Sequence, residues 1–248
     1  MYNPFTLQGK SILVTGASAG IGRAIAIECS KMGAVVFLSA RNSARLRETL
    51  AQMQGSGHQI ITADLTVEED IQALVDQLPQ LDGAVLNAGV AGLVPTQAIT
   101  ADKLSRMQQI NLNAPILLTR SLVKQRKLNN PSSIVFTSSA AGVYRTSVGN
   151  AIYATTKCGI DAFMRTAALE LASRGIRCNS VNPAMVETEL IAGLPVSEQE
   201  REKNLQQYPL HRYGKPEEVA YAVVYLLSDA SAWTTGTALK LDGGLTLS

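Results

Sequence analysis

Residues 11–32 read SILVTGASAGIGRAIAIECSKM, and this stretch determines the fold. The run SILVT at 11–15 predicts a buried strand. A helix is predicted from about Ile21 to Met32, where Gly33 provides a C-terminal cap. The turn between strand and helix holds three glycines in the spacing Gly-x3-Gly-x-Gly, namely Gly16, Gly20 and Gly22.

A glycine-rich turn between a strand and a helix is suited to bind a diphosphate. Glycines let the backbone turn tightly and approach the ligand, and the helix N-terminus offers unpaired N–H groups and a positive dipole end. A merely structural turn is the alternative, but strand, turn and helix follow one another in the order that the motif requires. The predicted cofactor contacts here are Gly16, Ser18, Gly20, Ile21 and Gly22.

Short apolar runs alternate with amphipathic stretches along the rest of the chain. The further predicted strands are 35–39, 58–63, 83–87, 134–137, 177–182 and 238–242. The further predicted helices are 43–54, 68–78, 101–127, 153–173 and 216–228. Apolar strands separated by helices form parallel sheets that are covered on both faces. We therefore predict a single-domain α/β chain over residues 1–248, with a doubly wound (Rossmann) fold and a parallel sheet of about seven strands.

The stretch 184–212 interrupts this alternation. It contains Pro195, the charged run SEQEREK at 197–203 and Pro209. A connection of this length in a compact domain is usually functional. We expect a lid or a small helical insertion on the substrate side, with a passive surface excursion as the alternative.

Composition excludes several other classes of protein. The 248 residues are 46% apolar, and their 22 basic and 20 acidic side chains leave a net charge of +2. This is too apolar for disorder and lacks the basic excess of a nucleic-acid-binding domain. No apolar run reaches the ~18 residues of a membrane helix, and the N-terminus does not resemble a secretory signal. Three scattered cysteines and two histidines predict neither a disulfide framework nor a metal site. We expect a cytoplasmic protein with no metal, nucleic-acid or membrane partner.

The end of the second predicted strand indicates which dinucleotide is bound. A carboxylate there would bind the ribose of NAD, but residues 39–42 read SARN. The guanidinium of Arg41 favours the 2′-phosphate of NADP, unless Arg41 is only a solvated surface residue. After the third strand, the carboxylate of Asp64 is placed to accept a hydrogen bond from the adenine amino group, with Leu65 beside it.

Tyr153 and Lys157 lie four residues apart in the stretch YATTK, on one face of a predicted helix. A nearby ammonium favours the phenolate and lowers the pKa of a tyrosine, which would let Tyr153 exchange protons near neutral pH. The predicted strand at 134–137 runs into Ser138 and Ser139, at the sheet edge where doubly wound folds bind ligands.

Several ordered motifs together resemble the short-chain dehydrogenase/reductase family. They are TGASAGIG at 15–22, LNAG at 86–89, Asn111, the serine pair, YATTK at 153–157 and NPAMVET at 182–188. The resemblance runs from about Leu7 to the terminal LDGG. Within the family, the chain is most similar to 3-oxoacyl-(acyl-carrier-protein) reductases.

The resemblance implies a role for each catalytic candidate. Tyr153 would give a proton to the substrate carbonyl oxygen, and Lys157 would hold the nicotinamide ribose and lower the tyrosine pKa. Ser139 would donate a hydrogen bond to the same oxygen, with its neighbour Ser138 as the alternative. Asn111 would hold a proton-relay water beside the lysine. Asn113 is the lesser candidate for the relay position of Asn111.

The resemblance also implies further cofactor contacts. These contacts are Asn87, Ala88, Gly89, Tyr153, Lys157, Pro183, Val186 and Thr188, with Thr188 at the nicotinamide carboxamide. The chain departs from the usual pattern at Leu86, where another asparagine is common, and at Ala184, where glycine is usual.

The implied activity is NADPH-dependent reduction of a 3-oxoacyl thioester, as in fatty acid biosynthesis, by a homotetramer. The same residues would serve another ketone or secondary alcohol, such as a sugar, a steroid or a small diketone. A non-catalytic cofactor-binding protein is a third interpretation.

The loop at 144–146 is expected to shape the substrate pocket. Lys124, Arg126 and Lys127 form a basic cluster after the long helix and are expected beside the ligand-binding end of the sheet. An acidic carrier protein would dock on this cluster, unless it is only a solvated charge run.

Overall fold

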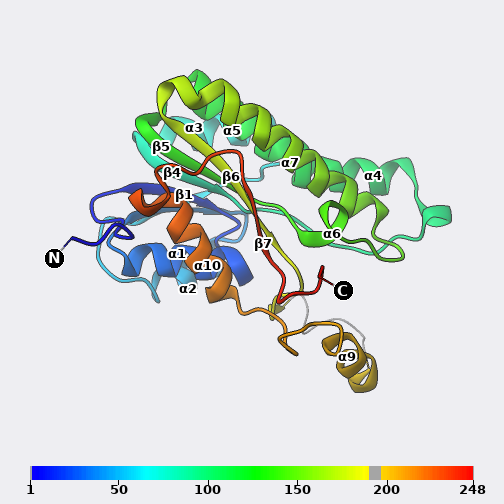
Figure 1. Ribbon diagram of the computed structural model, residues 1–248. Coiled ribbons are helices and arrows are strands. Elements are labelled where there is room, and N and C mark those ends of the chain that lie inside the picture. The colour runs from blue at the N-terminus through cyan, green and yellow to red at the C-terminus, as the bar shows by residue number, and fades with distance from the viewer. Residues whose placement is uncertain (1, 190–196, 248) are drawn as a thin grey trace.

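The computed structural model describes residues 2–189 and 197–247, and it contains a seven-stranded parallel sheet with helices on both faces (Figure 1). The strand order is β3-β2-β1-β4-β5-β6-β7. The direction of winding reverses between β1 and β4, as the predicted doubly wound fold requires. The strands are β1 (Ser11–Thr15), β2 (Val35–Ala40), β3 (Gln59–Thr62), β4 (Leu81–Leu86), β5 (Leu128–Thr137), β6 (Ile176–Pro183) and β7 (Ala238–Leu241).

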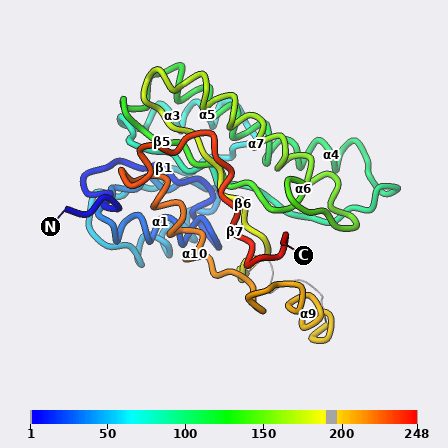
Figure 2. The backbone as a smooth tube through the Cα atoms, in the orientation of Figure 1, coloured from blue at the N-terminus to red at the C-terminus, as the bar shows by residue number. Residues whose placement is uncertain are grey.

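Most of the described helices lie in a layer on one or the other face of the sheet (Figure 2). The described helices are α1 (Gly20–Lys31), α2 (Ser43–Leu50), α3 (Glu68–Gln77), α4 (Ala101–Gln108), α5 (Ala114–Lys124), α6 (Ala140–Val143), α7 (Ala151–Leu171), α9 (Glu198–Leu205) and α10 (Pro216–Leu227). Side chains of β1 alternate between the two faces, as in any strand. Leu13 packs in the core under α3, α5 and α7, whereas Ile12 and Val14 pack in the core under α1 and α10. Both faces of the strand are therefore buried, which explains its continuous apolar run.

Two element boundaries differ from the sequence-based predictions by four residues or more. The helix predicted over 43–54 ends at Leu50, because tight turns then lead the chain toward Gly55 and Gly57, which have positive φ. The strand predicted over 134–137 begins at Leu128, which pairs with Leu81 before the register shifts. Its first six residues, LNNPSS, are mostly polar, so apolar periodicity gives no signal there.

The stretch 101–127 is helical but not uniform. It consists of α4, a π-helical turn at Gln109–Asn113, and α5. A π-turn inside a helix is often found at a functional site. Here it carries Asn111 to the edge of the sheet where the catalytic candidates lie.

The described part of the predicted insertion at 184–212 contains one helix, α9. A capping box between Ser197 and Glu200 begins this helix. None of its residues is buried, and the helix projects from the body of the molecule (Figure 1). Tyr208 and Tyr213 anchor the segment by packing with Leu245 near the C-terminus. Residues 190–196 of the insertion lie outside the described residues, and its action as a lid stays a prediction.

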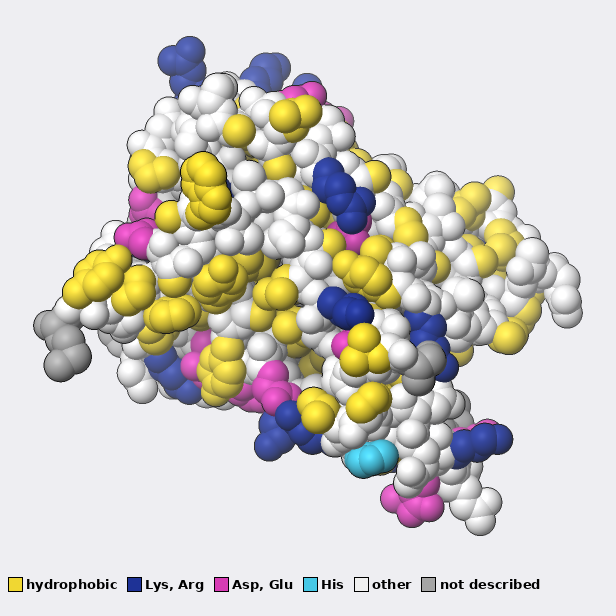
Figure 3. Space-filling view, in the orientation of Figure 1, with side chains coloured by type: hydrophobic (Ala, Val, Ile, Leu, Met, Phe, Trp, Pro, Cys, Tyr) yellow, Lys and Arg dark blue, Asp and Glu magenta, His cyan; other side chains and the backbone are white. Residues whose placement is uncertain are grey.

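The surface shows no single-sign region on the face seen in Figure 3. Basic and acidic side chains are interspersed over it, in keeping with the net charge of +2. Within residues 2–189 and 197–247, no helix is both long and apolar enough to cross a membrane.

Candidate active site

The sequence-predicted motifs converge at the carboxyl ends of the central strands. The glycine-rich turn follows β1, Asn87–Gly89 follows β4, Ser139 follows β5, and Pro183 ends β6. Because all neighbouring strands are parallel, these ends meet at one edge of the sheet. That edge, at the reversal of strand order, is where doubly wound folds bind ligands.

The turn after β1 requires glycine, because a side chain at two of its positions would collide with neighbouring protein atoms. Gly16 has a φ of +67°, and a Cβ atom there would lie 2.9 Å from the Cα of Ala88. A Cβ on Gly22 would lie 2.2 Å from the carbonyl oxygen of Gly16. No described side chain caps α1 at Ala19, so the first N–H groups of the helix are available to an anion.

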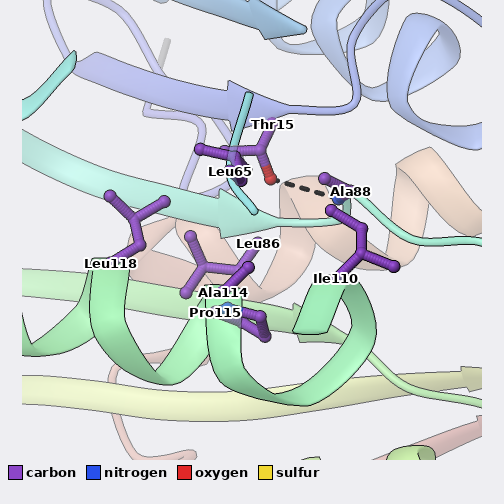
Figure 4. Close-up of a pocket in the computed structure, with 8 residues that line it drawn as sticks. All are labelled: Thr15, Leu65, Leu86, Ala88, Ile110, Ala114, Pro115 and Leu118. Atoms are coloured by element: carbon purple, nitrogen blue, oxygen red, sulfur yellow. Dashed lines mark hydrogen bonds between the residues drawn. The ribbon is translucent and has the colours of Figure 1, made fainter. Parts of the chain in front are cut away.

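Thr15 ties this turn to the segment after β4. Its Oγ1 accepts hydrogen bonds from the backbone N–H groups of Asn87, at 3.0 Å, and Ala88, at 3.1 Å. The bond to Ala88 is visible in Figure 4. Behind Ala88 the packing leaves a cavity of only about 10 Å³, lined mainly by apolar side chains. That space holds one water at most, so this region is packed core rather than a substrate site.

The segment after β6 covers the glycine-rich turn. The Cγ2 atom of Thr188 would lie 3.3 Å from a Cβ on Gly20, which has a φ of +51°. Val186 is buried and bridges to Gly214. Among the described residues, positive φ outside glycine occurs at Arg126 and His211, so Ala184 is accommodated without backbone strain. The predicted contacts of this segment therefore face those of the first turn.

Arg41 and Asp64, which are predicted to contact the adenosine half of the cofactor, lie together. The Arg41 side chain is 73% exposed, and its Nη1 atom is 3.8 Å from Oδ2 of Asp64. Asp64 Oδ1 accepts hydrogen bonds from the backbone N–H and the hydroxyl of Thr66. These bonds, with a smaller contribution from Arg41, hold the pKa of Asp64 below its usual range. Asp64 is thus a fixed acceptor, while the guanidinium of Arg41 remains accessible to a phosphate.

The catalytic candidates meet between β5 and α7. The buried Lys157 Nζ lies 5.6 Å from the ring centroid of Tyr153 and donates a hydrogen bond to the carbonyl of Thr137, at 2.8 Å. The Ser139 hydroxyl lies close enough to Tyr153 to act on the tyrosine pKa, and its Oγ accepts a hydrogen bond from the backbone N–H of Ala141, at 3.1 Å. Ser138 instead donates to the carbonyl of Lys157, at 3.0 Å. The structure therefore groups Ser139, rather than Ser138, with Tyr153 and Lys157.

Burial changes the proton affinities of Tyr153 and Lys157. Desolvation lowers the pKa of Lys157 to about 8, against the opposing effect of the charge on Asp161. Desolvation also raises the pKa of Tyr153, although the hydrogen bond with Ser139 acts in the opposite direction. The expected lowering of the tyrosine pKa by Lys157 is not found, because loss of hydration penalises the phenolate more than its surroundings stabilise it.

Asn111 lies beside Lys157, but its side-chain amide is already engaged. It accepts from the backbone N–H of Val90 and donates to the Val90 carbonyl, both at 2.8 Å. A Cβ on Gly89 would lie 3.1 Å from Oδ1 of Asn111 and 3.6 Å from Nζ of Lys157. Asn113 is exposed and donates to the Gln109 side chain instead. The geometry therefore favours Asn111 over Asn113 as the neighbour of the lysine.

The loop at 144–146 links the candidate site to distant parts of the chain. The Tyr144 hydroxyl donates to the carbonyl of Ala238, at 3.2 Å. Arg145 donates to the side chain of Gln207, at 2.7 Å, just beyond α9. The loop therefore joins β7 to the described part of the insertion.

The basic cluster of Lys124, Arg126 and Lys127 lies at the wrong end of the sheet for its predicted role. The Lys127 carbonyl accepts from the backbone N–H of Leu81, at 2.8 Å, where β4 begins. The Lys127 ammonium donates to the carbonyls of Asp76 and Leu78. The cluster therefore flanks the amino ends of β4 and β5, a strand length away from the candidate site. Its expected position beside the active site is wrong.

Sequence reasoning missed the polar residues that support the catalytic candidates. Thr137 supplies the carbonyl that holds Lys157, and Asp161 lies one helical turn beyond that lysine. The only signal for Asp161 was its spacing from Lys157 within an otherwise apolar stretch. No local pattern distinguishes such a residue from a solvated surface carboxylate.

Comparison with known proteins agrees with this geometry. A protein-family model described as Enoyl-(Acyl carrier protein) reductase matches residues 16–246. The 3-oxoacyl-[acyl-carrier-protein] reductase FabG of Rickettsia felis is 33% identical over 239 residues, which cover 96% of this chain and 98% of that protein. Among solved structures, a candidate gluconate dehydrogenase from Agrobacterium tumefaciens matches with a TM-score of 0.92 and 27% identity, over 99% of both chains. A candidate 2-deoxy-D-gluconate 3-dehydrogenase from the same organism, with bound NADP, matches with a TM-score of 0.90 and 27% identity, over 100% of both chains.

Proposed function

Because the chain belongs to the short-chain dehydrogenase/reductase family of oxidoreductases, we propose that it reduces a carbonyl group to a hydroxyl with NADPH. The observation that carries this proposal is the grouping of Ser139, Tyr153 and Lys157 at the same edge of the sheet as a glycine-rich turn with a helix N-terminus that no described side chain caps. A similar chain was solved with bound NADP. The presence of all three catalytic candidates argues against a non-catalytic cofactor-binding protein.

The proposed reaction follows from the positions and charges of these side chains. NADPH, when bound, supplies the hydride for the carbonyl carbon. Ser139 and Tyr153 donate hydrogen bonds to the carbonyl oxygen, and Tyr153 gives it a proton as negative charge develops. Each such fixed donor is worth about 2.7–4 kcal/mol. Lys157 holds positive charge next to Tyr153, and Asn111 borders the route by which a proton returns.

For the substrate we favour a 3-oxoacyl thioester. The loops after β4 and β5 meet through a hydrogen bond from the Val94 N–H to the Gly149 carbonyl, at 2.7 Å. These loops present Leu93, 69% exposed, and Val148, 91% exposed. An apolar rim suits an acyl chain better than a polyol, and the FabG relatives point the same way. The similar structures described as gluconate dehydrogenases support a sugar acid or another ketone as the second candidate.

Oxidation of NADPH, followed at its absorbance band, tests the proposal. Acetoacetyl-CoA is the first substrate, NADH the cofactor control, and a panel of ketones, keto-sugar acids and secondary alcohols comes next. Turnover of acetoacetyl-CoA supports the thioester assignment. Turnover only with another carbonyl retains the reaction type and transfers the assignment to that substrate. No turnover with any carbonyl would refute the proposed chemistry.

Replacing Arg41 by alanine is expected to raise the KM for NADPH by about 10- to 100-fold and to leave the KM for NADH nearly unchanged. A charge-assisted hydrogen bond to phosphate is worth about 1.5–3 kcal/mol, and each 1.4 kcal/mol is a factor of ten. Steady-state kinetics with both cofactors measure the ratio. Arg47→Ala, at an exposed position on α2, the helix that follows Arg41, is the control. Equal losses for both cofactors would contradict the role of Arg41.

The pH dependence of the reduction is expected to have a falling limb near pH 8. Burial lowers the pKa of Lys157 to about 8, so the ammonium loses its proton as the pH rises through that value. The pKa of Tyr153 is raised, and its phenol therefore stays protonated over the same range. Reduction should thus be fast below pH 8 and slow above it, as measured by kcat/KM across a buffer series. A rate that rises through this range would contradict the assignment.

We also infer a homotetramer from the family resemblance, with contacts through α4, α5, α7 and the C-terminal region. The 81% exposure of Leu169 on α7 supports a contact on that helix. Light scattering on the purified protein measures the molecular mass in solution. A monomer at micromolar concentration would contradict the inference.

A further inference from the structure

A buried carboxylate lies directly beyond the catalytic lysine. Asp161 follows Lys157 by one helical turn on α7, so the two side chains share a face of that helix. Asp161 is only 1% exposed. Among the described residues, no cation forms an ion pair with it within 4.0 Å, although its charge acts on Lys157.

Two side chains of β6 hold this carboxylate. The Ser180 hydroxyl donates to Oδ1 of Asp161, and the Asn182 amide donates to Oδ2, both at 2.7 Å. The same amide nitrogen donates to the backbone carbonyl of Ser139, at 3.2 Å. A continuous hydrogen-bonded path therefore connects Asp161 with the backbone of the catalytic serine.

Burying the charge of the Asp161 carboxylate costs free energy, so we infer that this charge serves a function. An ionised carboxylate that leaves water loses its hydration, and hydrogen bonds recover only part of that loss. A neutral amide of the same shape could also bond Ser180 and Asn182, without the desolvation of a charge. A carboxylate, unlike an amide, stabilises the positive charge of Lys157, which is also buried.

We propose that Asp161 is a positioning residue of the active site, whose buried carboxylate keeps Lys157 cationic and, through Asn182, fixes the backbone of Ser139. This inference rests on the proposed function, because it assigns Asp161 a role through the catalytic residues. In its support, burial lowers the pKa of Lys157 to about 8, and the Asp161 charge acts to raise it.

No other titratable group faces Lys157 from the elements packed around it within the described chain. On α7 its titratable neighbours are Tyr153 and Asp161. The loop after β4 contributes Gly89, the π-turn contributes the amide of Asn111, and β5 contributes the carbonyl of Thr137. A change in the Lys157 titration therefore reports chiefly on Asp161.

The decisive variant is Asp161→Asn. An amide can accept from Asn182 and donate to Ser180, whose hydroxyl already lies 3.0 Å from Oδ1 of Asn182. The variant therefore removes the charge and keeps the shape. We expect the falling limb of kcat/KM against pH to move about one unit lower, since an opposite charge nearby typically shifts a pKa by at least that amount.

The matched control is Ser180→Ala. It removes one hydrogen bond from Asp161 and leaves the carboxylate in place. We expect kcat to fall in this variant while the pH of the falling limb stays at its wild-type value. A purely structural role for Asp161 would instead make the two variants alike, with lower rates and an unmoved limb, and would overturn the proposal.

A second readout does not depend on catalysis. NMR titration of protein labelled with ¹³C at the lysine Cε atoms gives the Lys157 midpoint without cofactor, with Lys157→Met to assign the signal. The midpoint should be lower in Asp161→Asn and unchanged in Ser180→Ala. If the wild type reduces no carbonyl, the proposed function fails, yet this titration still decides whether Asp161 sustains the lysine charge. Should Asp161→Asn unfold, Asp161→Ser is titrated in its place, and an unshifted midpoint would overturn the proposal.

Discussion

Replacing Tyr153 by phenylalanine is expected to lower kcat for carbonyl reduction by about 10³-fold and to leave NADPH binding within about twofold of wild type. The phenol is the proton donor in the proposed reaction, and a positioned general acid typically contributes 10²- to 10⁴-fold. Phenylalanine keeps the ring beside the Lys157 ammonium, 5.6 Å from its centroid in the wild type, so the packing survives. Single-turnover kinetics and titration of NADPH fluorescence measure the two quantities separately.

Tyr144→Phe is the matched control for this experiment. It removes a phenolic hydroxyl that donates to the carbonyl of Ala238, at 3.2 Å, outside the Tyr153 and Lys157 contact. We expect this control to change KM more than kcat, because its loop is predicted to shape the substrate pocket. Full turnover in Tyr153→Phe would show that another group delivers the proton, and the proposed mechanism would be abandoned.

Features encoded by neighbouring residues could be predicted from the sequence. The turn at Gly16, Gly20 and Gly22 requires only that a strand precede it and a helix follow it. Tyr153 and Lys157 meet because helical geometry alone brings residues four apart onto one face. The parallel sheet follows similarly, since its strands are apolar runs separated by helices.

Features that depend on contacts between distant residues could not be predicted. The family resemblance favours Ser139 over its neighbour Ser138, but the physical properties of two adjacent serines do not distinguish them, and the packing around α7 shows that Ser139 lies at Tyr153. The direction of the Tyr153 pKa shift depends on desolvation by the whole fold, so the i+4 spacing from Lys157 gives the wrong sign. The basic cluster near Lys127 was misplaced for a related reason, because the sequence shows proximity to a strand but not to which of its ends.

Replacing Gly22 by alanine is expected to weaken NADPH binding by about 10- to 100-fold. The added methyl would lie 2.2 Å from the Gly16 carbonyl oxygen and 2.5 Å from Nδ2 of Asn87, so the turn would have to open. Overpacking of a tightly packed site costs about 1–3 kcal/mol. In this turn the added methyl destabilises the conformation that presents N–H groups to the diphosphate. Since each 1.4 kcal/mol is a tenfold change in an equilibrium constant, this destabilisation is expected mainly as a higher Kd for NADPH.

Gly92→Ala separates this effect from a general intolerance of the chain toward larger residues. A Cβ on Gly92 would lie 3.6 Å from the Cε atom of Met107, an ordinary van der Waals contact, and its φ is not positive. Fluorescence titration gives the Kd of each variant, and thermal unfolding followed by circular dichroism shows whether each one folds. Folded Gly22→Ala protein with weakened NADPH binding would locate the diphosphate at this turn. Wild-type affinity in that variant would mean that the cofactor binds elsewhere, because no arrangement of the observed turn can hold both the methyl and the Gly16 carbonyl in place.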